Sequence, residues 1–323
     1  MIRINKLTKA TYEKDNQLEL LLMQLNDWNF ITVTGSDAKK YLQSQLTADI
    51  NELSIEKHVF TAHCDAKGKM WTTLRLFHYK KGFGYILRTS VAKKQLSEMK
   101  KYSIFSKIRL IHQHNIILLG ISGQSAREVL NKHFSELPDK EKSVIHLEKT
   151  TLLHFTVPSE RFLIITDSVN AFKLTKYFRQ HSDSKQWLAL DIAAGFANID
   201  IENSAKFIPQ AVNLQSFPSS ISFQKGCYIG QEIIARTKYR GLNNRSVFWL
   251  AGKANTLPKI GKPIEWKIGD NWRYTGIVLA AVKLTDNTIT IQVVMKHDIP
   301  KDSVFRLLEE RDSKLTIQEF FVC

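Results

Sequence analysis

The spacing of apolar residues in the first third of the chain changes between strand-like and helix-like periods. Apolar runs flank Asn26-Asp27, two residues that favour turns, so we expect residues 18–34 to form a β-hairpin whose second strand begins at Trp28. Ser36 is suited to cap a short helix that follows. Strands are then expected at 59–63, 70–78 and 83–88, followed by a helix at 91–102. These three strands predict an antiparallel meander.

The middle of the chain alternates strands and helices, whereas the last part contains strands alone. Between residues 108 and 183 the order strand, helix, strand, strand, helix predicts a small ferredoxin-like α/β module. A helix around Trp187 and a short helix from Gln231 follow. Beyond Gly241, short strands recur between turn residues, which is typical of a small β-barrel. The charged stretch 301–314 is expected to be mobile at its edges. The pattern as a whole predicts an α+β protein.

Composition adds a strong positive charge to this picture. The chain has 323 residues, of which 43% are hydrophobic, and a formal net charge of +15. Since single cores stop growing at about 250–300 residues, two or three modules are expected. The charge is compatible with acidic partners such as nucleic acid or a polyglutamate tail. Lys outnumbers Arg and is spread over the whole chain, which favours a general compositional bias over a dedicated nucleic-acid interface.

Several classes of protein are disfavoured by what the sequence lacks. The cysteines Cys64, Cys227 and Cys323 form no CxxC pair and have no His at zinc spacing, so neither a disulfide framework nor a structural zinc site is indicated. No phosphate loop, dinucleotide fingerprint, HExxH or GxSxG motif occurs. No apolar signal-peptide core or membrane-length apolar span is found. We therefore expect a soluble, cytoplasmic protein.

The most informative segment is Lys225-Gly226-Cys227-Tyr228-Ile229-Gly230-Gln231-Glu232. Its glycines permit a tight backbone path, and a helix beginning near Gln231 would place free N–H groups beside the Cys227 thiol. Together with the neighbouring Lys225, these features would lower the pKa of the thiol. A buried, inert cysteine is the alternative, because free cysteines are among the most buried residues.

This segment resembles the signature of the YgfZ family, the folate-binding relatives of the glycine-cleavage aminomethyltransferase. The resemblance extends over nearly the whole chain, through the runs at 63–71, 207–215 and 276–283. It implies a three-module ring with a folate-sized central channel and a C-terminal β-barrel. The expected modules are residues 1–107 continued by 184–241, residues 108–183, and residues 242–323. It also implies a cytoplasmic role for tetrahydrofolate or another reduced folate in tRNA modification, with support of iron–sulfur enzymes and a link to replication initiation.

The resemblance also assigns the folate site. The folate-contacting tryptophans of the family fall on Trp28 and Trp187, and an indole is suited to stack on a flat pterin. For an arbitrary tryptophan a core role is the more common alternative. The anionic tail of a folate requires cations, for which the nearest candidates in sequence are Lys225, Arg236, Lys238 and Arg240. An ordinary solvated basic turn is the alternative for these four residues.

The chain departs from the aminomethyltransferases at the strand that follows Gly68. Paired carboxylates are expected there, but Thr72-Thr73 stand in their place, and a hydroxyl is a poor general acid or base at neutral pH. We therefore favour a folate-binding accessory protein with a functional thiol at Cys227 over an enzyme. Two alternatives remain: a folate-dependent one-carbon transferase or demethylase that uses Cys227 as nucleophile, and a protein that binds tRNA directly. No metal is expected.

Overall fold

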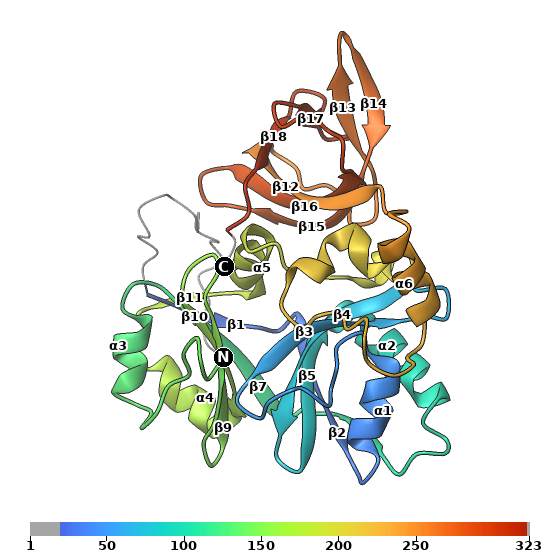
Figure 1. Ribbon diagram of the computed structural model, residues 1–323. Coiled ribbons are helices and arrows are strands. Elements are labelled where there is room, and N and C mark those ends of the chain that lie inside the picture. The colour runs from blue at the N-terminus through green and yellow to red at the C-terminus, as the bar shows by residue number, and fades with distance from the viewer. Residues whose placement is uncertain (1–19, 322–323) are drawn as a thin grey trace.

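A computed structural model describes residues 20–321, and three β-sheets arranged around a central helix dominate it (Figure 1). The first sheet follows from the alternating apolar pattern between residues 28 and 112. Its strands, in spatial order, are β3 (His58–Cys64), β4 (Met70–Tyr79), β5 (Gly82–Arg88), β2 (Trp28–Thr34) and β6 (Arg109–His112). Consecutive antiparallel pairing of β3, β4 and β5 confirms the predicted meander.

Two amphipathic helices cover one face of the first sheet, α1 (Ala38–Gln45) and α2 (Thr89–Lys101). Their apolar side chains, such as Leu42 and Met99, share a core with Leu74 and Leu76 of β4. The opposite face of the same strands contributes Phe60, Phe77 and others to a second and larger core. The cap of α1 is Asp37 rather than the predicted Ser36.

The second sheet has six strands and carries α3 (Ala126–Asn131) and α4 (Ser168–Thr175). In spatial order the strands are β11 (Gln180–Ser182), β1 (Leu21–Gln24), β7 (Ile116–Ser122), β10 (Arg161–Asp167), β9 (Thr150–Phe155) and β8 (Val144–His146). The predicted hairpin at 18–34 is wrong, because β1 pairs with β7 and β11 whereas β2 pairs with β5 and β6. The Asn26-Asp27 turn instead carries the chain between two sheets. Residues 18 and 19 of that prediction lie outside the described residues.

The third sheet has seven antiparallel strands and curls around its own apolar core (Figure 1). The strands, in spatial order, are β14 (Asn271–Thr275), β13 (Ile264–Ile268), β17 (Val304–Arg306), β18 (Lys314–Gln318), β12 (Arg245–Lys253), β16 (Thr288–Lys296) and β15 (Ile277–Lys283). No ladder joins the edge strands β14 and β15 among the described residues, so the predicted barrel is open. The stretch 301–314, expected to be mobile at its edges, contains β17 and the first residue of β18.

The helix α5 (Ser184–Ala193) packs between the second and the third sheet. It contacts β1 of the second sheet and β15 and β16 of the third. All its residues except Lys185 are buried, as expected for a helix that is packed on every side. Short 3₁₀ turns η1 (Ile201–Asn203), η2 (Pro209–Val212) and η3 (Leu214–Ser216) lead from it to α6 (Gln231–Tyr239). Within residues 20–321, no helix is long and apolar enough to cross a membrane.

Candidate functional site

The two tryptophans selected from the sequence, Trp28 and Trp187, line one small cavity. Trp28 opens β2 of the first sheet, whereas Trp187 lies on α5, so residues far apart in the chain meet there. Both indoles are buried. The cavity has a volume of about 30 Å³. That volume holds one or two water molecules and is much smaller than the channel expected from the resemblance.

Each of these tryptophans has a guanidinium group against its ring. The Arg88 Cζ lies 4.4 Å from the ring centroid of Trp28, and the Arg161 Cζ lies 4.2 Å from that of Trp187. Arg88 is paired with Asp200, at 3.1 Å between Nε and Oδ1. Cations at these distances are attracted by the negative face of an indole. The contacts fix the orientation of both rings.

A buried ion pair lies one helical turn after Trp187. Asp191 accepts a hydrogen bond from Nη2 of Arg161 at 2.7 Å and one from Nδ2 of Asn198 at 3.0 Å. Asp191 and Asn198 both line the cavity. Arg161 is fully buried, and its Nε and Nη1 atoms have no hydrogen-bond partner within the described structure. Unpaired buried donors are rare in proteins and mark a place where a polar ligand or water can bind.

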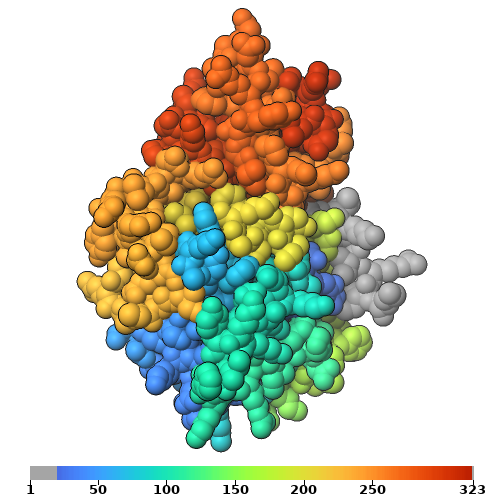
Figure 2. Space-filling model, turned by 90° about the vertical axis from the view of Figure 1, so that its right-hand side faces the viewer, coloured from blue at the N-terminus to red at the C-terminus, as the bar shows by residue number. Residues whose placement is uncertain are grey.

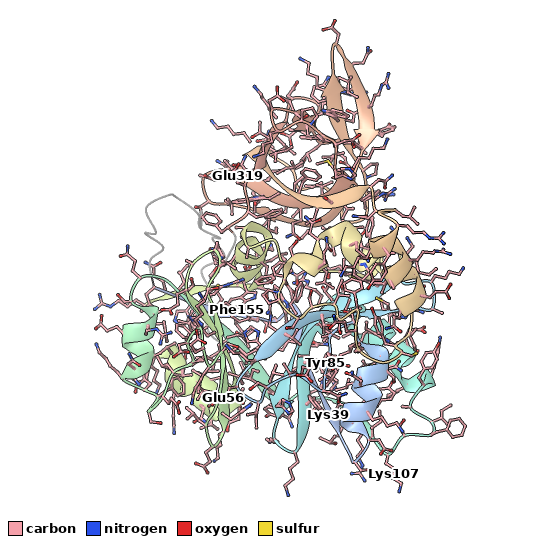
Figure 3. All side chains as sticks on the ribbon, in the orientation of Figure 1. Lys39, Glu56, Tyr85, Lys107, Phe155 and Glu319 are labelled. Atoms are coloured by element: carbon pink, nitrogen blue, oxygen red, sulfur yellow. The ribbon has the colours of Figure 1, made fainter. Side chains whose placement is uncertain are left out.

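Aromatic rings complete the wall of the cavity around a third arginine, Arg75. The Arg75 Cζ lies 4.4 Å from the ring centroid of Phe196 and 4.6 Å from that of Phe155. Phe155 meets Trp187 edge to face, with ring centroids 5.3 Å apart, and lies near α5 at the centre of the molecule (Figure 3). The cavity is thus a cage of aromatic and aliphatic side chains that contains one guanidinium group, that of Arg75, and one carboxylate, that of Asp191.

Sequence reasoning did not select Arg75, Arg161, Asp191 or the phenylalanines of this cage. Asp191 could have been found, because it lies four residues after Trp187 and therefore on the same face of α5. Arg161 and Phe155 belong to β10 and β9, whose approach to α5 depends on tertiary packing. No local pattern indicates that contact.

Thr72 and Thr73, which replace the expected carboxylates, are both buried in β4. The Thr73 hydroxyl lines the cavity but donates to the carbonyl of Ala197 at 2.6 Å. Thr72 donates to the carbonyl of Thr73 at 2.9 Å, with Ile199 O a further 3.4 Å contact. Because both hydroxyl protons are used by backbone carbonyls, neither side chain offers a free group for proton transfer.

The segment around Cys227 forms a surface loop that packs against the turn Asp65–Lys69. Gly230 precedes α6 with a φ of +82°, and a Cβ at this position would lie 2.5 Å from Asp65 O. Gly68 has a φ of +69° and its own added Cβ would lie 3.2 Å from Ile233. Glycine is therefore required at both positions. The runs 63–71 and 225–232, which carry the family resemblance, pack against each other at this point. Cys227 is exposed, does not line the tryptophan cavity, and contrasts with the buried Cys64.

The structure separates the four candidate cations from the tryptophans. Lys225 is buried, and its Nζ donates to the carbonyls of Leu46 at 2.7 Å and Ala48 at 2.6 Å. Burial lowers the pKa of Lys225 to about 8. Arg236, Lys238 and Arg240 are exposed on α6 or just beyond it, and none of the four residues lines the cavity. Lys225 therefore ties the Cys227 loop to the segment that directly follows α1.

The arrangement of three sheets around α5 is that of the aminomethyltransferase T-proteins. The crystal structure of glycine cleavage system aminomethyltransferase T from Bartonella henselae matches 94% of this chain and 86% of that chain, with a TM-score of 0.72 and 14% sequence identity. At this identity the match shows the fold. Residues 243–310 match the family model described as the YgfZ beta-barrel domain.

Relatives at much higher identity define the family. The chain is 53% identical over 302 residues to the tRNA-modifying protein YgfZ of Photorhabdus laumondii, which covers 93% of this chain and 92% of the relative. It is 50% identical over 306 residues to the protein of the same name from Yersinia enterocolitica, covering 94% and 92%. The chain therefore belongs to the YgfZ family, and the resemblance drawn from its motifs is confirmed.

Proposed function

We propose that the protein binds tetrahydrofolate or another reduced folate between Trp28 and Trp187 and acts in the modification of tRNA. The observation that carries the folate part is that Trp28 of β2 and Trp187 of α5, which are far apart in the chain, line the same cavity. The tRNA part is supported by the relatives, which are named as tRNA-modifying proteins.

The residues of the cavity suit a pterin chemically. Trp28 and Trp187 offer aromatic faces for stacking. The amino-pyrimidinone edge of a pterin carries N–H donors and a carbonyl acceptor. The donors match the carboxylate of Asp191, which lines the cavity, and the acceptor matches the unpaired nitrogens of its partner Arg161, whose side chain does not itself line the cavity. A cavity of about 30 Å³ cannot hold the bicyclic ring, so binding requires the side chains that close it to move apart. A bound reduced folate would supply a carrier for one-carbon units.

A binding role fits these residues better than a catalytic one. The hydroxyl of Thr73 is held by Ala197, the carboxylate of Asp191 is held by Arg161, and Cys227 lies outside the cavity. No group of the cage is thus free to move a proton. Incubation with tetrahydrofolate and a methylated amine separates the two roles, since a one-carbon transferase or demethylase that uses Cys227 would turn the amine over.

The exposed thiol belongs to a different part of the proposal. Cys227 lies on a loop held by Lys225 and Gly230, at a surface that a partner protein can reach. We assign to it a role in supporting iron–sulfur enzymes of tRNA thiolation or methylthiolation in the cytoplasm, with no part for a membrane. A link to replication initiation enters this proposal only through the resemblance.

Folate binding is tested by titrating the full-length protein with tetrahydrofolate and following tryptophan fluorescence. Trp28→Phe and Trp187→Phe are each expected to weaken binding, because the smaller ring loses stacking area. Trp272→Phe is the matched control, since Trp272 in the third sheet also has a guanidinium over its ring, that of Arg306 at 4.1 Å. Unchanged binding by both cavity variants would refute the site.

A further inference from the structure

A row of positive side chains without acidic partners extends from the last turn of α6 into the segment that follows this helix. Arg236, Lys238, Arg240 and Arg245 are exposed, and the segment 236–245 contains no Asp or Glu. None of the four forms an ion pair within the part of the chain that the structure describes. Four arginines elsewhere in the described residues do form ion pairs, for example Arg127 with Glu160. This segment therefore keeps its charge available to an anionic partner.

The row continues onto the third sheet, because Arg245 is also the first residue of β12. Its cross-strand neighbour on β16 is Lys296, so two cations stand directly opposite each other. Like charges in that position destabilise a sheet. We call Arg236, Lys238, Arg240, Arg245 and Lys296 the basic edge. Figures 1 and 2 show α6 below and to one side of the third sheet, and the chain runs from α6 into β12, so that the two parts adjoin.

The basic edge borders a hollow of about 300 Å³ that contains an exposed aromatic ring. Arg245, Lys296 and Tyr274 line it, together with the Gly276 turn, and no carboxylate does. The side chain of Tyr274 is 74% exposed. Glu265 lies opposite Tyr274 on β13, but its carboxylate is neutralised by Arg306, with Nε and Oε2 2.6 Å apart. The volume is at the lower end of the range for ligand pockets.

A second pair of opposed cations provides a comparison for the Arg245–Lys296 pair. It shows that a lysine-rich composition can place two cations opposite each other without forming a hollow beside them. Lys253 and Lys314 face each other at the other end of β12, and both are exposed. Neither lines the hollow described here, and neither is followed by a run of further cations. The basic edge differs in combining charge, concavity and an exposed ring.

We propose that the basic edge and its hollow bind RNA directly, with phosphates held by Arg245 and Lys296 and an unpaired base stacked on Tyr274. Cations that track a backbone, combined with an aromatic ring for stacking, are the elements that single-stranded RNA regions require. An acidic protein would satisfy the cations but would give the exposed ring no base to stack on. The inference deepens the tRNA part of the proposed function and rests on it, and it is independent of folate.

The test is the binding of an unmodified tRNA transcript to the full-length protein, measured by fluorescence anisotropy over a series of KCl concentrations. The double variant Arg245→Gln/Lys296→Gln is expected to bind about tenfold or more weakly at low salt and to lower the salt slope by about 1.5. Lys253→Gln/Lys314→Gln removes the same charge from the other end of β12 and its neighbour β18, and is expected to bind like the parent. Tyr274→Ala should weaken binding about tenfold, whereas Tyr274→Phe should not.

Three results would overturn the proposal. One is parent-like affinity of the Arg245/Lys296 variant. Another is an equal loss in the Lys253/Lys314 variant, which would indicate binding by total charge alone. The third is a protein that fails to bind tRNA but binds a polyglutamate peptide through Arg245 and Lys296, which would assign the surface to an acidic protein. Folate titration of the same variants should match the parent, so a failure here is distinguishable from a failure of the folate site.

Discussion

Gly120 of β7 leaves the space that the indole of Trp187 occupies. A Cβ built on Gly120 would lie 2.5 Å from Cε3 and 2.9 Å from Cζ3 of that indole. Both atoms are far inside van der Waals contact, and Gly120 is confined between Met23 of β1 and Leu163 of β10 in the sheet. The ring therefore has its position because one methyl group is absent.

Replacing Gly120 with alanine is expected to displace the Trp187 ring and to cost about 1–3 kcal/mol of stability, the usual range for an overpacked core. If Trp187 stacks on a folate, tetrahydrofolate affinity should fall as well. Urea unfolding and fluorescence titration measure the two effects. Gly226→Ala is the control for stability, since no atom lies within 4 Å of its added Cβ. Equal midpoints for the two variants would contradict the prediction.

Loss of the Asp191 carboxylate should destabilise the protein strongly. Asp191→Asn keeps the shape of the side chain but leaves the Arg161 charge fully buried without a counter-charge. Breaking such a pair costs about 3–5 kcal/mol. Glu319→Gln is the matched control, because Glu319 pairs with Lys301 on the open surface and should show no measurable change in the urea midpoint. A parent-like midpoint for Asp191→Asn would mean that Arg161 finds another partner.

Much of this architecture follows from local pattern. Strands and helices at the meander, at α5 and at α6 lie within a few residues of their predicted positions, because apolar periodicity reports the buried face of each element. Apolar periodicity does not determine which strands pair with each other. The Asn26-Asp27 turn predicts a hairpin, yet Asp27 N donates at 3.0 Å to the hydroxyl of Ser184, which lies 157 positions away.

The candidate site shows the same limit. Trp28, Trp187 and Cys227 were selected because motifs surround them, and the tryptophans do share a cavity. Lys225 was selected for its charge, yet its ammonium binds the carbonyls of Leu46 and Ala48. Whether a charged side chain binds a ligand or the protein itself depends on which backbone groups the fold brings next to it. Sequence alone does not contain that information.

The acid stability of the protein should depend on His63. Both ring nitrogens of this residue are buried without a partner, and burial lowers its pKa to about 4, with nearby Glu98 acting in the opposite direction. The unfolded chain, with a pKa near 6.5, then binds a proton that the folded state does not. Stability is full above about pH 6.5 and falls by about 3 kcal/mol as the pH drops to about 4.

His63→Leu removes this titration, so the slope of unfolding free energy against pH between 6.5 and 4 should decrease by about one proton. His58 contributes to the same region, because burial lowers its pKa to about 3, so some slope should remain. Urea unfolding at half-unit pH intervals measures the slope. An identical slope in parent and variant would show that the pKa of His63 does not differ between the folded and unfolded states.

Cys227 should be the thiol that reacts first in the folded protein. Cys64 is buried, and burial raises the pKa of its thiol well above the ordinary value, so it should stay protected until the protein unfolds. Cys323 lies outside the described residues, and a Cys323→Ser background removes it from the count. At neutral pH, iodoacetamide should then label one site, which peptide mass spectrometry locates at Cys227.

The same residue separates the thiol role from the folate role. Cys227→Ser is expected to fold and to bind tetrahydrofolate like the parent, since Ser is nearly isosteric, the site is exposed, and Cys227 does not line the tryptophan cavity. In a deletion strain it should fail to restore methylthiolated tRNA nucleosides, which mass spectrometry of total tRNA quantifies. Cys64→Ser, if it folds, should restore them. Full restoration by Cys227→Ser at native expression would remove the thiol from the mechanism and leave Lys225 and Gly230 with a structural role in the loop.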